Sequence, residues 1–245
     1  MGEMDYYTSI GDTGRRHALN KPFSDPDVHA KLMQIGAVLA LLPPPPSDIL
    51  ECGCGAGWLT KLLAKIGYRT TGVDIAPPAI HLARSTTVFE GLALPRFEVA
   101  SAEALPFGIE FDAVLFFDSL HHVSDEASAI ADAYRVLRPG GVLITSEPGR
   151  GHHDSSRDTT AKYGVTEKDM PARHIARLAR EAGFRTAKIH PRADEIGRVM
   201  YESCRGGSPV TRFARSSTAG RGGRAIRRML WTRMDNGIVV CTKSG

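Results

Sequence analysis

Histidine and glutamate side chains suited to proton transfer follow two strongly apolar stretches of the chain. His121 and His122 come shortly after the apolar run 113–118, and Glu147 comes directly after the run 142–146. Neutral imidazole is the major form of histidine at pH 7 because its reference pKa is about 6.5. A neighbouring carboxylate would fix the tautomer and stabilise the imidazolium that forms. The pattern predicts a general base, either His121 or His122, with Glu147 as its partner; a histidine packed against a backbone carbonyl at a helix entry is the alternative.

A second histidine pair lies a few residues after Glu147. His152 and His153 precede Asp154 in a stretch rich in glycine, serine and aspartate. They could contact a substrate, act as a base or, with Asp154, bind a metal ion, and a solvated loop is the structural alternative. A metal site built on carboxylates would have only Asp118 and Glu147 after the two apolar runs. The sequence therefore predicts no metal site.

A glycine-rich turn at 49–57, ILECGCGAG, has the composition of a ligand-binding turn. It follows a strand-like stretch and precedes a helical one, so backbone amides and a helix N-terminus would face the ligand. A dinucleotide fingerprint requires a third glycine at position 58, where the chain has Trp58. Asp74, 23 residues after Glu51, could accept hydrogen bonds from the hydroxyls of an adenosine ribose. These features fit both a dinucleotide and S-adenosylmethionine, so the neighbouring segments must decide.

Alternating strand-like and helical segments must position these groups. Strands are predicted at 48–52, 70–74, 97–100, 113–118, 142–146, 186–190 and 238–242. Helices are predicted at 58–66, 78–90, 126–137 and 172–182, and from a cap at Asp25 or Asp27 to about residue 42. This alternation is typical of an α/β fold with a doubly wound, mostly parallel sheet of seven strands. Because such sheets bind ligands beyond the carboxyl ends of their strands, both apolar runs should deliver their polar residues to one place.

The chain is predicted to form one domain, residues 1–245, with three parts. Residues 1–47 supply loops or short helix and one longer helix, as an N-terminal lid. Residues 48–147 supply the ligand-binding core. Residues 148–245 supply a long substrate loop or lid at 148–170, the last helix and the final strand pair, which flank an arginine-rich insertion.

Three further segments carry a family resemblance. SAEALPF at 101–107, FDAVLFFDSLHHV at 111–123 and RVLRPGGVLI at 135–144 follow the glycine turn in order and at suitable spacing. Taken together, residues 49–147 resemble class I S-adenosylmethionine-dependent methyltransferases of the small-molecule type, which includes quinone-biosynthesis and sugar O-methyltransferases. The resemblance implies a Rossmann-like methyltransferase fold and S-adenosyl-L-methionine as cofactor, with S-adenosyl-L-homocysteine as product. That cofactor has no pyrophosphate, so the missing glycine of the dinucleotide turn is not needed.

The resemblance also implies a role for each matching position. Many members have an aspartate where this chain has Ser101, and a hydroxyl binds the adenine amine less strongly than a carboxylate. In related enzymes an N-terminal segment covers the cofactor, which here would bring Tyr7 and Arg15 over the site. The implied cofactor contacts are Glu51, Gly53, Gly55 and Gly57 for the methionine end, Asp74 for the ribose, Ile75, Ser101, Ala102 and Glu103 for the adenine, and Phe117 and Asp118 for the amino group.

The predicted activity is methylation of a small molecule, most directly at a hydroxyl, where a base would help. Sugar O-methyltransferases of this type use a histidine and an acidic residue at positions matching His121 or His122 and Glu147. N-methylation of a heterocyclic metabolite, an RNA or protein methyltransferase, and a cofactor-binding regulator without transferase activity remain alternatives. The sequence D-S-L-H-H after the fourth strand differs from the D/N-P-P-Y signature, which counts against methylation of nucleic-acid bases.

Nine arginines between residues 198 and 233, with Glu202 as the one acidic residue, form the arginine-rich insertion. An anionic substrate or nucleic acid could bind such a segment, and a solvated insertion is the favoured alternative. Within the arginine-rich core the aromatic residue is Phe213, so base stacking has little support. Nucleic acid is therefore disfavoured as a partner, and the sequence indicates no oligomeric state.

Composition places the chain among ordinary globular proteins. The apolar content is 42%, the formal net charge is only +4, and the four cysteines are too few and too scattered for a disulfide framework. The polar start, MGEMDYYTSI, has no apolar core of a signal peptide, and no apolar run is long enough to span a membrane. These features lead us to expect a cytoplasmic protein.

Overall fold

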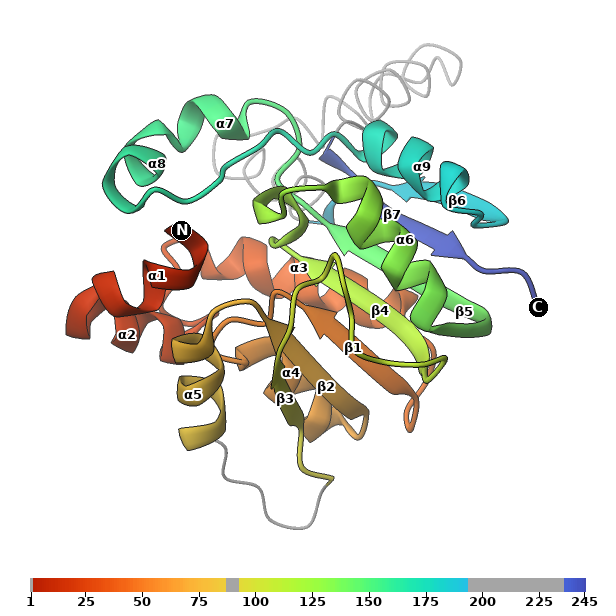
Figure 1. The fold of residues 1–245 in the computed structure, drawn as a ribbon, viewed down its shortest axis with the longest axis horizontal. Coiled ribbons are helices and arrows are strands. Elements are labelled where there is room, and N and C mark those ends of the chain that lie inside the picture. Colours follow the sequence, from red (N-terminus) through yellow and green to blue (C-terminus); the bar gives the residue numbers. More distant parts are fainter. Residues whose placement is uncertain (1, 87–92, 194–235) are drawn as a thin grey trace, which may run out of the picture.

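The chain forms a seven-stranded sheet with helices on both faces, as seen in a computed structural model that describes residues 2–86, 93–193 and 236–245 (Figure 1). The strand order is β3-β2-β1-β4-β5-β7-β6. Strands β1 to β5 are parallel, and β7 is antiparallel to both of its neighbours. The strands are β1 Asp48–Cys52, β2 Arg69–Asp74, β3 Arg96–Val99, β4 Phe111–Phe117, β5 Leu137–Ser146, β6 Thr186–His190 and β7 Ile238–Thr242. The predicted fold class is confirmed.

Local signals in the sequence explain where the main helices begin and end. Helix α4 ends at Gly67, whose φ of 111° suits the left-handed conformation of a helix stop. Helix α6 begins at a side-chain cap, because the Asp125 carboxylate accepts hydrogen bonds from the amides of Ala127 and Ser128. The helices are α1 Gly2–Ser9, α2 Gly11–Asn20, α3 Val28–Leu41, α4 Trp58–Ile66, α5 Pro77–Ser85, α6 Glu126–Val136, α7 His152–Ser155, α8 Arg157–Tyr163 and α9 Ala172–Glu181, with a 3₁₀ turn at Leu120–His122.

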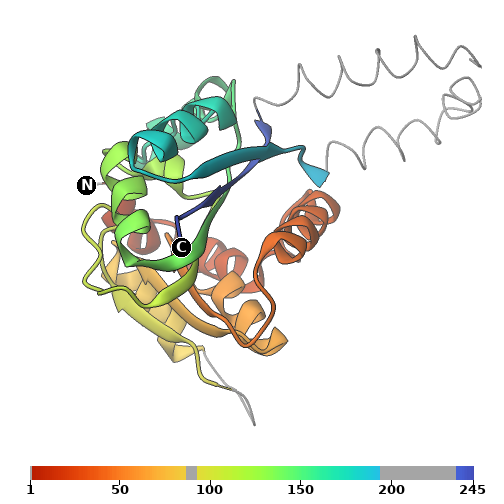
Figure 2. The same cartoon turned by 90° about the vertical axis from the view of Figure 1, so that its right-hand side faces the viewer.

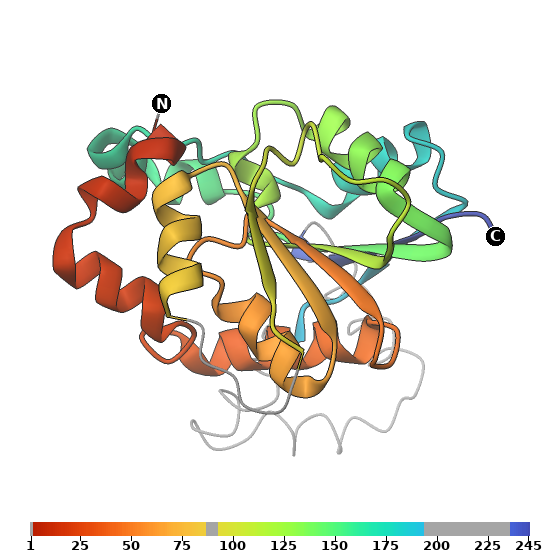
Figure 3. The ribbon, with the colours of Figure 1, turned by 60° about the horizontal axis from the view of Figure 1, so that its bottom comes forward.

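Two apolar layers hold the sheet between its helices. On one face α6 and α9 pack their small and branched side chains on β4, β5 and β7, and on the other face α3 and α4 pack on β1 and β4. The side views in Figures 2 and 3 show the sheet between these layers. Every residue of β4 except Asp112 is buried, as expected for a parallel strand covered on both faces. The strand ends that carry the candidate site are therefore anchored in a buried apolar core.

Several element boundaries differ from those predicted, by one or two residues in β2, β3, β4, α6 and α9, and by five residues at the start of β5 and at the end of α5. Strand β5 begins at Leu137, not at residue 142, because Leu137 already pairs with Phe111 across a register irregularity. Asp27 stands at the start of α3, but its side chain makes no capping hydrogen bond. Its backbone carbonyl instead accepts hydrogen bonds from the amides of Ala30 and Lys31. Turn and cap signals thus locate these elements only to within a few residues.

Short helices form where the sequence indicated mostly loops. Residues 1–24 were predicted to be loops or short helix, and they contain α1 and α2. Residues 148–170 were predicted to be a long loop, and they contain α7 and α8, which are bounded by left-handed glycines at Gly151 and Gly164. Neither α7 nor α8 has a buried residue, so no apolar periodicity marks them in the sequence.

The arginine-rich insertion, residues 198–233, lies outside the described residues. Within the described ranges, none of the helices combines the length and the apolar character that crossing a membrane requires.

Gly57 and Gly140 offer a matched test of packing at the glycine turn. Both have a similar positive φ, 74° and 77°. A methyl group at Gly57 would lie 2.4 and 2.6 Å from ring atoms of the buried Phe97, whereas one at Gly140 would meet no atom within 4 Å. Gly57→Ala should therefore lower the free energy of unfolding by about 1–3 kcal/mol more than Gly140→Ala, beyond the φ strain that both share. Urea unfolding of both variants measures the difference, and equal losses would show that the turn does not approach Phe97 closely.

Candidate active site

A cavity of about 620 Å³ opens at the carboxyl ends of the parallel strands. Its walls come from the turn after β1, the ends of β2 and β4, the loop after β3, the N-terminal helices and the segment around α7 and α8. Helices α1 and α8 lie side by side over this end of the sheet, where Tyr6 and Tyr163 make an edge-to-face contact (Figures 1 and 3). Open α/β sheets bind ligands at this position, and the volume suits a small molecule or cofactor.

The glycine turn lines the inner end of the cavity. The amides of Gly53 and Cys54 both donate to the carbonyl of Val73, which fixes the turn against β2. Gly55 has φ 53° and donates its amide to the Asp74 carboxylate at 2.8 Å. A side chain at Gly55 would collide with the Tyr7 hydroxyl, because its Cβ would lie 2.3 Å away. The turn is therefore shaped by close approach of β2 on one side and of the N-terminal segment on the other.

Asp74 stands at the end of β2, in the wall of the cavity. Its two carboxylate oxygens accept hydrogen bonds from the amides of Gly55 and Ala76, at 2.8 and 2.9 Å. Burial raises the pKa of Asp74, and these two hydrogen bonds oppose that shift. The next side chain, Ile75, is 44% exposed and presents an apolar surface to the same cavity. The pair combines hydrogen-bond acceptors with a flat apolar contact, which suits a ribose and an attached base.

Glu51 lies below the glycine turn and is almost fully buried. The Thr60 hydroxyl donates a short hydrogen bond to its carboxylate. Burial raises the pKa of Glu51 to about 7, although the hydrogen bonds from Thr60 oppose that shift. A cationic group that enters the cavity beside Glu51 would lower this pKa again.

The loop after β3 supplies a third wall. Ser101, Ala102 and Glu103 all line the cavity. The Ser101 hydroxyl accepts a hydrogen bond from the Glu103 amide at 3.1 Å, so it caps its own turn. The Glu103 carboxylate reaches the start of α6, where it accepts hydrogen bonds from the amides of Ser124 and Asp125. Both polar side chains therefore shape the loop as well as the cavity.

Asp118 and Phe117 lie where β4 ends. Asp118 has φ 49°, the one positive φ of a non-glycine residue in the described ranges, and its carboxylate forms a close ion pair with Lys31 of α3. The Lys31 ammonium also lies 5.3 Å from the centre of the Phe117 ring. Burial, followed by repulsion from Lys21, lowers the pKa of Lys31 to about 8. Lys31 was not predicted as a site residue.

The N-terminal segment places one of its two predicted contacts in the main cavity. Tyr7 lines this cavity, and burial raises the pKa of its hydroxyl far above the ordinary value. Arg15 lines only a neighbouring hollow, between α2 and α5, whose lining shares Tyr7 with the main cavity. Tyr7 therefore covers the glycine turn, whereas Arg15 does not reach it.

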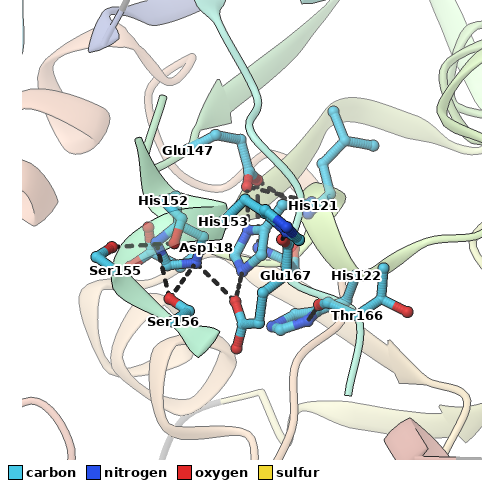
Figure 4. Close-up of polar contacts among 12 residues, drawn as sticks. Asp118, His121, His122, Glu147, His152, His153, Ser155, Ser156, Thr166 and Glu167 are labelled. Atoms are coloured by element: carbon cyan, nitrogen blue, oxygen red, sulfur yellow. Dashed lines mark hydrogen bonds and ion pairs between the residues drawn. The ribbon is translucent and has the colours of Figure 1, made fainter. Parts of the chain in front are cut away.

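His121 and Glu147 form the predicted pair (Figure 4). His121 Nδ1 lies 2.7 Å from the Glu147 carboxylate, and His121 Nε2 faces Glu167 at 3.4 Å. The Glu147 carboxylate is buried and also accepts hydrogen bonds from the amides of Ser119 and Leu120, at 3.2 and 3.0 Å. Burial opposes the charge on His121, but hydrogen bonds to both glutamates outweigh it and raise its pKa to about 9.

The other histidines have different partners. His122 Nδ1 lies 2.5 Å from the Thr166 carbonyl oxygen and not against Glu147, and His152 Nε2 lies 2.6 Å from the Glu167 carboxylate. Both line the cavity. His153 is exposed and its Nδ1 contacts the Glu167 carbonyl, so it does not reach the cavity. All four histidines predicted for the site therefore contact Glu167 or its neighbour in the chain, Thr166, and three of them line the cavity (Figure 4).

Glu167 was missed by the sequence analysis. It follows α8 in a polar stretch without periodicity, 20 residues after Glu147. Hydrogen bonds to His121 and His152 outweigh the effect of burial and strongly lower its pKa. No pattern in the sequence connects this glutamate to the histidines, because the two short helices α7 and α8 bring it back over the strand ends.

Comparisons with known proteins agree with this geometry. Residues 50–145 match the family model described as a methyltransferase domain. The chain is 31% identical over 140 residues to an S-adenosylmethionine-dependent methyltransferase of Mycolicibacterium smegmatis, covering 56% of this chain and 51% of that protein. It is 34% identical over 143 residues to the ubiquinone biosynthesis O-methyltransferase of Xanthomonas axonopodis pv. citri, covering 58% and 55%. The chain thus spans about half the length of these curated relatives.

One solved structure extends the likeness to nearly the whole chain. A chain of the complex between the Haloferax volcanii Trm112 methyltransferase activator and a methyltransferase superposes with a TM-score of 0.63 at 17% identity. The match covers 97% of this chain and 100% of that chain, and shows that the fold is shared.

Residues 50–145 thus form a methyltransferase domain of the class I S-adenosylmethionine-dependent type. The residues of the cavity fit the cofactor of this family. Asp74 and Ile75 suit its adenosine, and the turn at Gly53 and Gly55, which both line the cavity without a side chain, suits its methionine end. A Cβ at Gly53 would collide with Ser119, and one at Gly55 with the Tyr7 hydroxyl. Gly57 does not line the cavity and instead starts α4 against Phe97.

Glu51 should make the stability of the methyltransferase domain depend on pH. Its pKa is about 7 in the folded protein and about 4.5 in the unfolded chain, so between these values the folded state keeps a proton that the unfolded chain releases. Rising pH therefore destabilises the wild type by on the order of 2–3 kcal/mol over this window, and Glu51→Gln removes that loss. Urea unfolding of both proteins at pH 5 and pH 7.5 should show Glu51→Gln gaining stability relative to the wild type as pH rises. A pH-independent difference would mean that Glu51 is ionised in the fold.

Proposed function

We propose that this chain is an S-adenosylmethionine-dependent methyltransferase that methylates a hydroxyl group of a small molecule. The observation that carries the proposal is the His121–Glu147 pair, whose imidazole reaches the cavity while its carboxylate is buried beneath it. The naming of relatives as ubiquinone biosynthesis O-methyltransferases supports oxygen as the acceptor atom.

The pair would take the proton that a hydroxyl loses when it is methylated. Glu147 accepts from His121 Nδ1, which leaves Nε2 as the proton-accepting nitrogen on the cavity side. The cofactor supplies an electrophilic methyl group on a sulfonium. As the oxygen–carbon bond formed and the carbon–sulfur bond of the cofactor broke, the hydroxyl proton would pass to Nε2, and Glu147 would stabilise the imidazolium.

Glu167 sets a condition on this reaction. Its carboxylate lies 3.4 Å from His121 Nε2, the position that the acceptor oxygen has to reach. While Glu167 stays there, the high pKa of His121 keeps Nε2 protonated at neutral pH. An acceptor that displaces this carboxylate removes one of the two interactions that raise the pKa of His121, while Glu147 keeps the other, and so favours release of the Nε2 proton as the site is occupied. The segment that carries Glu167 therefore couples substrate entry to the readiness of the base.

His121→Ala and Glu147→Gln should separate catalysis from cofactor binding. Turnover should fall by about 10²–10⁴-fold in His121→Ala, because the proton acceptor is lost, and by a smaller factor in Glu147→Gln. The affinity for S-adenosylhomocysteine should change little, because neither side chain belongs to the turn or to Asp74. Formation of S-adenosylhomocysteine against a panel of hydroxylated and heterocyclic metabolites gives the turnover, and calorimetry gives the affinity. His81→Ala, an exposed change on α5, is the control.

Full turnover in both variants with a hydroxyl acceptor would refute the base. Transfer only to nitrogen acceptors, unaffected by His121→Ala, would support N-methylation of a heterocyclic metabolite instead, because a neutral nitrogen nucleophile needs no base.

A further inference from the structure

A cluster of three side chains in the wall of the cavity has the composition of a transition-metal site. His121, His122 and Glu167, called the HHE cluster below, each offer a ligand atom, and these atoms lie within 4.8 Å of one another. The two histidines come from the turn after β4, and the glutamate comes from the segment after α8 (Figure 4). Two imidazoles and one carboxylate form a common ligand set for divalent transition metals that keep open positions.

The hydrogen bonds around the HHE cluster orient both imidazoles toward a common ligand. His121 Nδ1 lies 2.7 Å from the Glu147 carboxylate, and His122 Nδ1 lies 2.5 Å from the Thr166 carbonyl oxygen. Both acceptors require a proton on Nδ1, so Nε2 is the atom that remains to bind an ion. Metal-binding histidines usually donate their other ring nitrogen to a carboxylate or a backbone carbonyl in this way.

The spacing of the ligand atoms is close to what an ion requires. His121 Nε2 and Glu167 Oε2 lie 3.4 Å apart. Ligands at about 2.0–2.1 Å from a tetrahedral ion lie about 3.4 Å from each other, so this edge is already formed. The other ligand atoms of the cluster lie within 4.8 Å of one another, so an edge has to shorten by at most roughly 1.4 Å, which side-chain rotation can supply. His152 Nε2, 2.6 Å from Glu167 Oε2, stands beside the cluster as a further nitrogen donor.

We propose that the HHE cluster binds a divalent transition-metal ion of the zinc type through His121, His122 and Glu167. Imidazole nitrogens favour zinc, cobalt or nickel over magnesium, which prefers an all-oxygen shell. Because Glu167 belongs to the segment over the cavity and the histidines belong to the core, the bound ion fastens that segment to the strand ends. The acidic ligands considered in the sequence analysis were Asp118, Glu147 and Asp154, and Glu167 was not among them, so this set was not foreseen.

The ion would compete with the proposed reaction. It takes the lone pair of His121 Nε2, which is the base of the methyl transfer proposed above, so ion binding should lower turnover. This consequence rests on the proposed function, whereas the metal site itself does not.

Metal binding can be measured without any activity. The full chain, prepared without a histidine tag and treated with a chelator, is titrated with Zn²⁺ against a chromophoric chelator, and Co²⁺ absorption reports the ligands. One Zn²⁺ should bind per chain, and Mg²⁺ at the same concentration should not. His122→Ala and Glu167→Gln should each weaken binding at least tenfold, and His81→Ala should bind like the wild type. Zn²⁺ at about 100 times its Kd should raise the Tm of the wild type by about 5–10 °C and that of Glu167→Gln much less.

Equal Zn²⁺ affinity in the wild type, His122→Ala and Glu167→Gln would overturn the site, as would the absence of binding by the wild type. Retained affinity for S-adenosylhomocysteine shows that each variant is folded. If His122→Ala does not fold, His122→Asn replaces it in the titration. A site that binds Zn²⁺ while Zn²⁺ leaves turnover unchanged would uphold the metal site and refute the base role of His121. If His121→Ala lost turnover while the wild type bound no Zn²⁺, the base role of His121 would be upheld and the metal site refuted.

Discussion

The buried carboxylate of Glu147 fixes the turn after β4 and the orientation of His121 at the carboxyl end of the sheet. It stands after β5 with 1% of its surface exposed and accepts hydrogen bonds from the amides of Ser119 and Leu120 as well as from His121 Nδ1. A buried carboxylate is costly unless such donors satisfy it, so the turn after β4 has to keep the shape that supplies them. Burial would raise the pKa of Glu147, but these donors hold it below its ordinary value. The orientation of His121 follows from this constraint.

The same turn joins the acceptor side of the cavity to the cofactor side. The Ser119 hydroxyl donates to the carbonyl of Cys52 at 2.7 Å, directly before the glycine turn, and a side chain at Gly53 would collide with Ser119. A continuous set of contacts therefore runs from Glu147 through Ser119 to the turn expected to hold the methionine end. The rigid strand ends fix these contacts, whereas α1, α7 and α8 cover them with elements that have few buried residues. The cavity thus has a well-buried floor and a lightly packed cover.

Sequence reasoning was accurate where one strong local signal acts. Strand β1 and helix α4 have the predicted bounds, because an apolar strand, a glycine turn and Gly67 mark them, and His121 meets Glu147 because both follow neighbouring parallel strands. Sequence reasoning failed where a residue reaches the site because the fold brings a distant segment back over it. Lys31 reaches Asp118 across 87 residues from a helix that is apolar over most of its surface, and Glu167 returns over the site on two short helices without periodicity. Such residues lie in segments whose position is set by tertiary contacts and not by local pattern.

The protonation order of the two His121 nitrogens tests the central claim most directly. Nitrogen NMR of the full chain labelled at histidine, kept free of metal with a chelator, can follow both ring nitrogens as the pH rises through about 9. If Glu147 holds Nδ1–H, then Nε2 loses its proton first and Nδ1 keeps its proton throughout the titration. Loss of the proton from Nδ1, with Nε2 still protonated, would contradict the claim that Glu147 presents His121 Nε2 to the cavity as a base.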